Sequence, residues 1–153
     1  MYQGRNYSVD VSATNTQSST LPWAGIWQTG TTVRPAIYEF SLGSSGAPAN
    51  QAASCLFQRS TSVGASSSFT PVALDPGDPA STTAAGFTFT TGPTLTANAY
   101  LYRFGLNQQA TFRWIAATGS EMKAPATANN GISLLNPAVS STWTAEGTLL
   151  FAE

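Results

Sequence analysis

The carboxylates that lie nearest to one another in the sequence are Asp75 and Asp78, in the stretch LDPGDP. Two carboxylates can serve as the acid and the base of a glycosidase when separate strands hold them across a cleft, and clustered oxygens can bind Ca²⁺. Here a proline follows each aspartate, and Asp beside Pro and Gly favours tight turns in which the carboxylate accepts backbone N–H groups. We therefore interpret Asp75 and Asp78 as turn-forming residues, with calcium binding and catalysis as the alternatives.

Other reactive side chains are scarce. The sequence has no histidine, which excludes a serine–histidine triad and removes the commonest general base and transition-metal ligand. The single cysteine, Cys55, excludes an intrachain disulfide, fits synthesis in a reducing cytosol and is expected to be buried in the strand-like SCLFQ. No GxxxxGK[ST] phosphate loop occurs. We expect no catalytic residue, no cofactor and no metal, so the chain is not expected to be an enzyme.

Tryptophan is the more informative residue. Trp23 and Trp27 lie in TLPWAGIWQTG, a segment without clean alternation between Pro22 and Gly30. They can cap the core, anchor a protein partner or stack on sugars. Trp143 is expected on a strand and is a third possible sugar platform. With Arg5, Trp23 and Trp27 form our set of candidate partner-contact residues.

The composition describes a single domain with few charges. Its 153 residues fit one folded unit over 1–153, and only 8% are charged against about 25% in a typical protein. A net charge of −1 gives no excess of basic residues for binding nucleic acid or an anionic membrane. The start lacks the apolar run of a secretory signal, and no apolar run is long enough to span a bilayer, so a soluble protein is expected.

Strand patterns occupy most of the chain, while helical periodicity is nearly absent. In RNYSVDVS, Tyr7, Val9 and Val11 alternate with polar residues, as in a half-buried strand. Similar short runs are separated by turn residues every 8–15 positions. This spacing predicts an all-β antiparallel sandwich of about eight to nine strands with little or no helix.

Further details of the strands can be predicted from alternation. In VRPAIYEFSLG, Ile37 should lie on the face opposite to Phe40 and Leu42, and Pro35 should mark an edge or a strand start. This run and AASCLFQRSTS are expected to pair as neighbours. The proline-rich stretch over residues 66–86 is expected to be a long ordered loop.

Three turns are predicted to be hairpins. They lie at residues 107–109, at residues 118–120 and at Asn130–Gly131, where Asn–Gly suits the positive φ of a type I′ turn. Three successive hairpins favour a meander that leads into a Greek key or jelly roll.

Three motifs in order resemble small structural proteins of tailed bacteriophage virions. They are an LDPGDPA loop within FTPVALDPGDPASTTAAG (residues 69–86), then LNQQATFRW and PATANNGI within residues 106–134. RNYSVDVS and the region from VRPAIYEFSLG to LFQRSTSVG follow the family layout more loosely. The resembling segments cover most of the chain.

The resemblance is to jelly-roll decoration, or cement, proteins. It implies a non-enzymatic protein that is made in the host cytoplasm and sits on the head surface of the virion, a homotrimer bound to the major capsid protein. Residues 1–5, as an extended N-terminal arm, and residues 15–30 are our candidates for contacts. The alternative is a carbohydrate-binding module of a phage fibre, and a glycoside hydrolase is a weaker third hypothesis.

Overall fold

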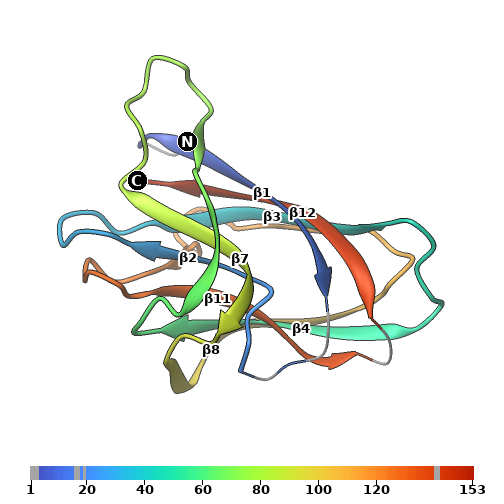
Figure 1. The fold of residues 1–153 in the computed structure, drawn as a ribbon. Coiled ribbons are helices and arrows are strands. Elements are labelled where there is room, and N and C mark those ends of the chain that lie inside the picture. The colour runs from blue at the N-terminus through green and yellow to red at the C-terminus, as the bar shows by residue number, and fades with distance from the viewer. Residues whose placement is uncertain (1–3, 16–17, 19, 140–141) are drawn as a thin grey trace.

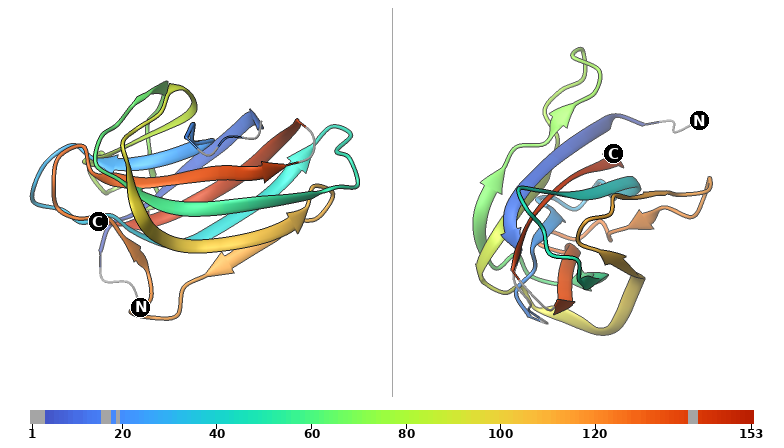
Figure 2. Two further views of the ribbon diagram at one scale, coloured as in Figure 1. Left: turned by 90° about the horizontal axis from the view of Figure 1, so that it is seen from below. Right: turned by 90° about the vertical axis from the view of Figure 1, so that its right-hand side faces the viewer.

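The computed structural model describes residues 4–15, 18, 20–139 and 142–153. These residues form twelve strands and no helix. The strands make two antiparallel sheets that pack face to face (Figures 1 and 2). The predicted all-β sandwich is confirmed, and the strand number is higher than the eight to nine expected.

The first sheet contains both ends of the described chain. Its strands in spatial order are β10 (Met122–Lys123), β3 (Ala36–Ser45), β12 (Trp143–Ala152), β1 (Asn6–Asn15) and β6 (Val72–Ala73), with β9 (Phe112–Ile115) also paired to β3. β9 and β10 pair with successive parts of β3, at Glu39–Leu42 and Ala36–Ile37. They therefore act as one strand that is interrupted by residues 116–121.

The second sheet covers the other side of the core. Its strands in spatial order are β5 (Ala65–Phe69), β7 (Thr83–Thr91), β2 (Ala24–Gln28), β11 (Gly131–Val139), β4 (Ala52–Ser60) and β8 (Leu95–Asn107). The predicted long loop over residues 66–86 is therefore wrong in part, because it contains most of β5, all of β6 and the start of β7. Together with β2, which lacks alternation because it is a central strand, β5 and β6 account for the higher strand number.

No two successive strands of the described chain are hydrogen-bonded neighbours. The three predicted hairpins are therefore wrong: residues 107–109 and Asn130–Gly131 lead from one sheet to the other, and residues 118–120 join the two halves of one interrupted strand. Instead the pairing is nested. β1 pairs with β12, β2 with β11, β3 with β9 and β10, and β4 with β8.

Aromatic side chains from the two sheets meet in the core. Phe40 of β3 and Phe57 of β4 lie with ring centroids 5.1 Å apart in an edge-to-face arrangement. The predicted pairing of these two strands is therefore wrong, because they face each other across the core. Cys55 is buried as predicted, and burial raises the pKa of its thiol to about 12.

A β-bulge breaks the predicted alternation in β3. Leu150 pairs with Glu39 while Phe151 pairs with Ile37, so Tyr38 is an extra residue in the ladder. The bulge turns Ile37 into the core on the same side as Phe40, and both side chains are buried. The prediction that Ile37 lies on the opposite face is therefore wrong, although β3 does start directly after Pro35.

The turn before β11 also differs from the predicted type I′ geometry. The positive φ of 67° belongs to Asn129, and Asn130 donates to the carbonyl of Thr127. Gly131 is the first residue of β11 and lies between β2 and β4. A Cβ at Gly131 would overlap the carbonyl oxygen of Ile26 and lie 2.9 Å from Cα of Trp27. Glycine is required here by close strand approach and not by a positive φ.

Replacing Gly131 with alanine should therefore lower the free energy of unfolding by roughly 2 kcal/mol or more, because the backbone of β2 must move. Urea denaturation measures the change. Gly30→Ala is the matched control, since a Cβ at Gly30 meets nothing within 4 Å. Equal stability of the two variants would contradict this account of the β2–β11 contact.

Candidate functional site

Residues 74–82 form a loop that extends beyond the sandwich beside the two ends of the chain (Figure 1). We call it the projecting loop. It connects β6 of the first sheet to β7 of the second and contains the LDPGDPA motif. It is the largest departure from the two packed layers in the views of the ribbon (Figure 2).

Asp75 builds the turn at the tip of the projecting loop. Its Oδ1 accepts the N–H of Gly77 at 2.9 Å, and its carbonyl oxygen accepts the N–H of Asp78 at 3.0 Å. This is the local bonding that a turn-forming aspartate makes. Asp78 faces Arg5 instead, with Nε and Oδ1 4.0 Å apart. The structure therefore places Arg5, one of the candidate contact residues, against the loop.

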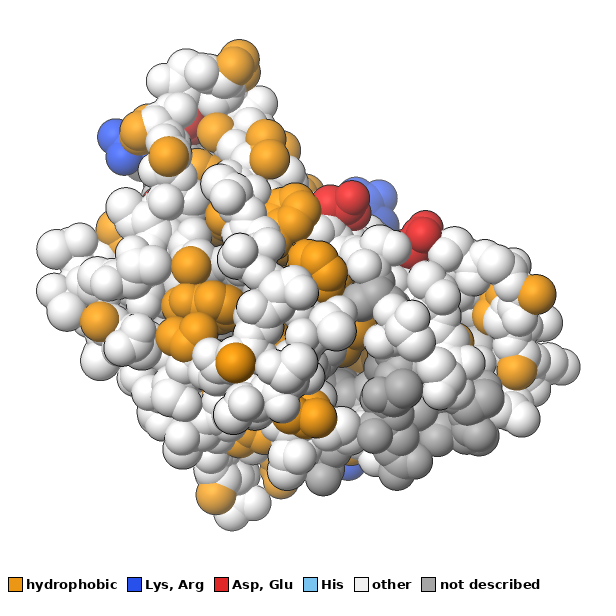
Figure 3. Space-filling view, in the orientation of Figure 1, with side chains coloured by type: hydrophobic (Ala, Val, Ile, Leu, Met, Phe, Trp, Pro, Cys, Tyr) orange, Lys and Arg blue, Asp and Glu red, His pale blue; other side chains and the backbone are white. Residues whose placement is uncertain are grey.

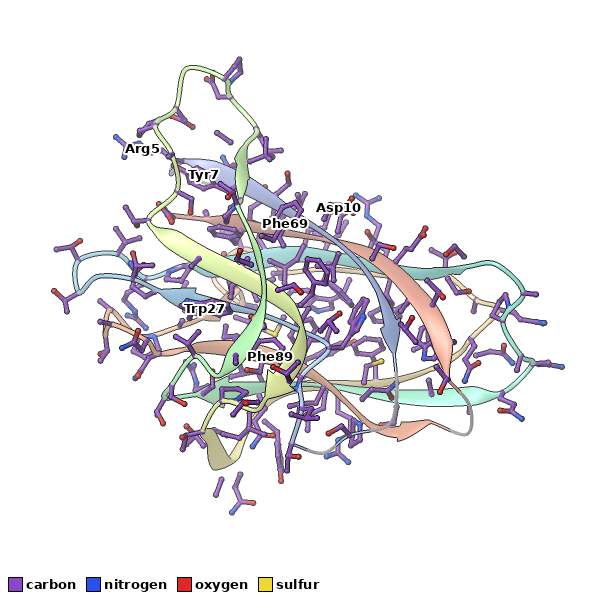
Figure 4. All side chains as sticks on the ribbon, in the orientation of Figure 1. Arg5, Tyr7, Asp10, Trp27, Phe69 and Phe89 are labelled. Atoms are coloured by element: carbon purple, nitrogen blue, oxygen red, sulfur yellow. The ribbon has the colours of Figure 1, made fainter. Side chains whose placement is uncertain are left out.

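The start of β1 holds the projecting loop from one side. The N–H of Leu74 donates to the carbonyl of Asn6 at 2.8 Å, and the hydroxyl of Tyr7 donates to the carbonyl of Pro79 at 3.0 Å. The ring of Tyr7 is fully buried and stacks on Phe151, with centroids 5.5 Å apart. Figure 4 shows Arg5 and Tyr7 beneath the loop. The loop is thus tied to the start of β1, whose Tyr7 packs on β12.

Glu153 holds the other end of the loop. Its carboxylate accepts the N–H of Thr83 at 2.7 Å, the N–H of Thr82 at 3.2 Å and the hydroxyl of Ser81 at 2.7 Å. Burial alone raises the pKa of Glu153, but these hydrogen bonds outweigh it and the pKa lies below its ordinary value. The charged form of Glu153 therefore stabilises the base of the loop.

Apolar side chains project from the same region. Val72 is 58% exposed and Leu74 is 52% exposed, at the base of the loop. Figure 3 shows apolar atoms on the projection and on the surface below it. A grouping of exposed apolar side chains on a fixed projection is typical of a protein contact surface. Alternation in TPVAL was the only sequence signal for it, and the prolines on either side obscured that signal.

The structure buries two of the three tryptophans considered for binding. Trp23 is 5% exposed and Trp143 is 4% exposed, and both belong to the core. Each has a buried indole N–H without a hydrogen-bond partner. Neither ring offers a free face to a partner or a sugar, so the contact role predicted for Trp23 and the sugar role considered for Trp143 are not supported by their positions.

Trp27 lies on the outer face of the second sheet. Its side chain is half-buried and meets Phe89 edge-on, with ring centroids 6.3 Å apart (Figure 4). A Cβ at Gly86 would lie 2.8 Å from Cη2 of Trp27, so the indole packs directly on the backbone of β7. The sugar hypothesis therefore depends on the exposed part of this one ring.

The remaining candidates fall in separate places. Asn130 accepts from the N–H of Gln28, which fixes the turn before β11 to the end of β2. Residues 1–3 of the predicted N-terminal arm lie outside the described residues, while Arg5 continues the β1 ladder. Residues 24–28, from the second contact segment, are the central strand β2 and are not a free arm.

Comparison with protein-family models, with curated proteins and with solved structures finds no match to this chain. In the described part of the chain, no three side chains of the His, Cys, Asp or Glu type are grouped so that they could hold a metal ion. No helix long and apolar enough to cross a bilayer occurs among the described residues.

The role of Glu153 makes the stability dependent on pH. Because its folded-state pKa is lowered, the stabilisation is present above the unfolded value of about 4.5 and is lost as the pH falls through the folded value. We expect Glu153→Gln to cost about 1 kcal/mol of unfolding free energy at neutral pH, since the carboxylate is partly solvated. The difference from the natural chain should disappear in acid.

Urea denaturation at neutral pH and in acid measures this difference. Asp10→Asn is the control, because Asp10 is exposed and no ion pair joins it to the loop among the described residues. A Glu153→Gln deficit that persists unchanged in acid would show that the charge of Glu153 does not support the loop.

Proposed function

We propose that this chain is a non-enzymatic structural protein of a tailed bacteriophage virion, a decoration protein that binds the outer surface of the head. In this role it stabilises contacts between subunits of the major capsid protein. The proposal combines the motif resemblance with two features of the structure: the strand order and the projecting loop.

The strand order supports a jelly-roll topology. We take β9 and β10 as one strand and β5–β7 as an insertion, which leaves eight strands. In chain order, the first of these pairs with the last, the second with the seventh, the third with the sixth and the fourth with the fifth. This nesting is that of an antiparallel ribbon wound around a core, which is the jelly roll found in capsid proteins. The insertion lies at the turn of the ribbon, where added chain leaves the pairing intact.

The projecting loop is the observation that carries the functional proposal. The LDPGDPA motif, which resembles the phage family, is the segment that leaves the sandwich and is tied down at both ends. Its first residue, Leu74, and Val72 of β6 at its base are exposed to solvent. A preformed apolar projection loses little conformational entropy when a partner covers it. We assign this surface to the contact with the major capsid protein.

Self-association completes the proposed function. With 8% charged residues and a net charge of −1, long-range repulsion between copies is weak. Small hydroxyl and methyl side chains also lose little rotamer entropy when an interface orders them. We propose a homotrimer on the capsid surface, in the virion, after synthesis in the host cytoplasm.

Binding to particles tests the proposal. Virions are prepared from a phage that encodes this chain, and the chain is stripped from them. These virions should rebind the purified protein. The Val72→Ser and Leu74→Ser double variant should bind at least about tenfold more weakly, because it lacks the two apolar anchors. Ile115→Ser is the matched control, since Ile115 is 56% exposed on β9, away from the loop. Co-sedimentation measures the binding. Unimpaired binding by the double variant would remove the loop from the interface, and no binding by the natural chain would refute the decoration role.

A further inference from the structure

Among the described residues, most of β1 has a hydrogen-bonded partner strand on one side only. β12 pairs with β1 along its whole length, from Asn6 to Asn15. On the other side β6 pairs with Tyr7 and Ser8 alone. The first sheet therefore ends in an open edge beyond Ser8, next to the base of the projecting loop.

The direction of the backbone groups on this edge follows from the ladder. In an antiparallel pair, alternate residues exchange both hydrogen bonds with one neighbour, and the residues between them point their N–H and C=O groups to the other side. Arg5 and Glu153 exchange both bonds, at 3.2 and 2.9 Å. The odd-numbered residues of β1 therefore face β12, and Asp10, Ser12 and Thr14 face the open side.

The hydrogen bonding between β1 and the segment that contains β6 agrees with this alternation of odd- and even-numbered residues. The carbonyl of Asn6, an even-numbered residue, accepts the N–H of Leu74 on that side. Asp10, Ser12 and Thr14 continue the same series, and all three residues are exposed. Within the described residues, no strand pairs with them on this side. They form a regular row of backbone donors and acceptors, the arrangement that accepts an added strand.

The chain cannot extend its own β6 along this edge. Antiparallel pairing of Val72 with Ser8 would place Thr70 opposite Asp10, but the chain arrives at Thr70 from β5 in the second sheet. The crossing between sheets therefore ends the cover over β1 at Ser8.

The outer face beside the open edge is acidic. Asp10 and Glu146 are exposed, and Glu146 accepts only a long hydrogen bond of 3.4 Å from Ser12 among the contacts of the described side chains. They line a shallow groove with the hydroxyl groups of Ser41, Ser44, Thr111 and Thr148. Neither carboxylate has an Arg or Lys within ion-pair distance in the described structure.

All six cations of the chain are placed in contacts elsewhere. Arg5 faces Asp78, Arg113 pairs with Glu39, Lys123 pairs with Glu121, Arg34 donates to Ala124, Arg59 donates to Lys123 and Arg103 lies over Tyr100. The acidic edge is therefore complementary to a cationic partner that the chain does not itself supply.

We propose that the open edge of β1, from Asp10 to Thr14, binds an extended segment of a different protein chain as an added β-strand, and that this segment carries Lys or Arg on its outward-facing positions. Main-chain bonds to Asp10, Ser12 and Thr14 hold the strand, and the carboxylates of Asp10 and Glu146 select its charge. If the proposed function holds, the capsid protein is the source of the segment, but the pairing itself does not depend on that function.

A second copy of this chain fits the edge less well. Pairing of two β1 edges would place the Asp10 and Glu146 carboxylates of both copies on one continuous sheet face without a cation among them. The edge strand β5, with the sequence ASSSF, has no charge. The cations next to the other edge strands, Arg103, Arg113 and Lys123, are engaged in contacts of their own. Charge complementarity therefore favours a partner of different sequence.

Amide hydrogen exchange by NMR tests the geometry first. In the purified chain, the amides of Asp10, Ser12 and Thr14 should exchange fast, and those of Val9 and Val11 should be protected by β12. A short peptide of alternating lysine and valine is the probe, and a peptide of alternating glutamate and valine is its charge-reversed control. Only the lysine peptide should protect Asp10, Ser12 and Thr14.

Three results would overturn the proposal. They are protection of these three amides in the purified chain, which would mean that the chain or a second copy already covers the edge; no protection by the lysine peptide; and equal protection by both peptides. None of them involves Val72, Leu74 or a virion, so each leaves the capsid-binding proposal standing.

Two variants separate the backbone and charge contributions. Ser12→Pro removes one outward N–H without breaking a bond to β12. Proline is tolerated on an edge strand where the N–H faces solvent, as at Ser12. This variant should abolish binding of the lysine peptide. Asp10→Asn should raise the dissociation constant about tenfold, and Glu39→Gln, the same change of charge farther across the sheet, should alter it less. Undiminished binding by both Ser12→Pro and Asp10→Asn would refute the proposal even if one of them were less stable.

Discussion

The ladder between β1 and β12 is the interaction on which the rest of the structure depends. It joins the two ends of the described chain through ten registered residue pairs in the first sheet. Alternate residues of both strands, such as Tyr7 and Phe151, point into the core and stack there. Because the ladder fixes Arg5, Tyr7 and Glu153 side by side, it also fixes the three groups that hold the projecting loop.

The nested pairing explains why this ladder matters so much. With no hydrogen bonds between successive strands, few contacts are local, and each pair forms only after a long loop has closed. Close backbone approach then replaces side-chain packing at selected points, as where Gly131 meets β2 and where Trp27 packs on Gly86. Both sheets are consequently sensitive to single methyl groups at such points, since a Cβ at Gly147 of β12 would lie 2.5 Å from the carbonyl oxygen of Ser41 in the first sheet.

Sequence alone predicted what depends on local alternation. The burial of Tyr7, Val9 and Val11 follows directly from the period of two, and so does the all-β sandwich. It could not predict which strands pair, because turn residues such as Asn130–Gly131 suit a hairpin and a crossing between sheets equally well. Nor could it locate the bulge at Tyr38 that turns Ile37 inward, since the cause lies in the register of β12. At the candidate site, the turn-forming role of Asp75 could be predicted from the sequence. The support of the projecting loop by Glu153 could not, because it depends on the fold.

Edge strands impose the last constraint, because an exposed row of backbone groups invites pairing with other chains. Most edges of this sandwich are short or irregular: β6 and β10 have two residues each, and β8 contains bulges and a positive φ of 57° at Asn98. β1 differs, since it continues as a regular strand beyond the end of β6. Its exposed side carries carboxylates, which repel a second copy and attract a basic segment. The same charges that prevent indiscriminate association can therefore make the remaining open edge selective.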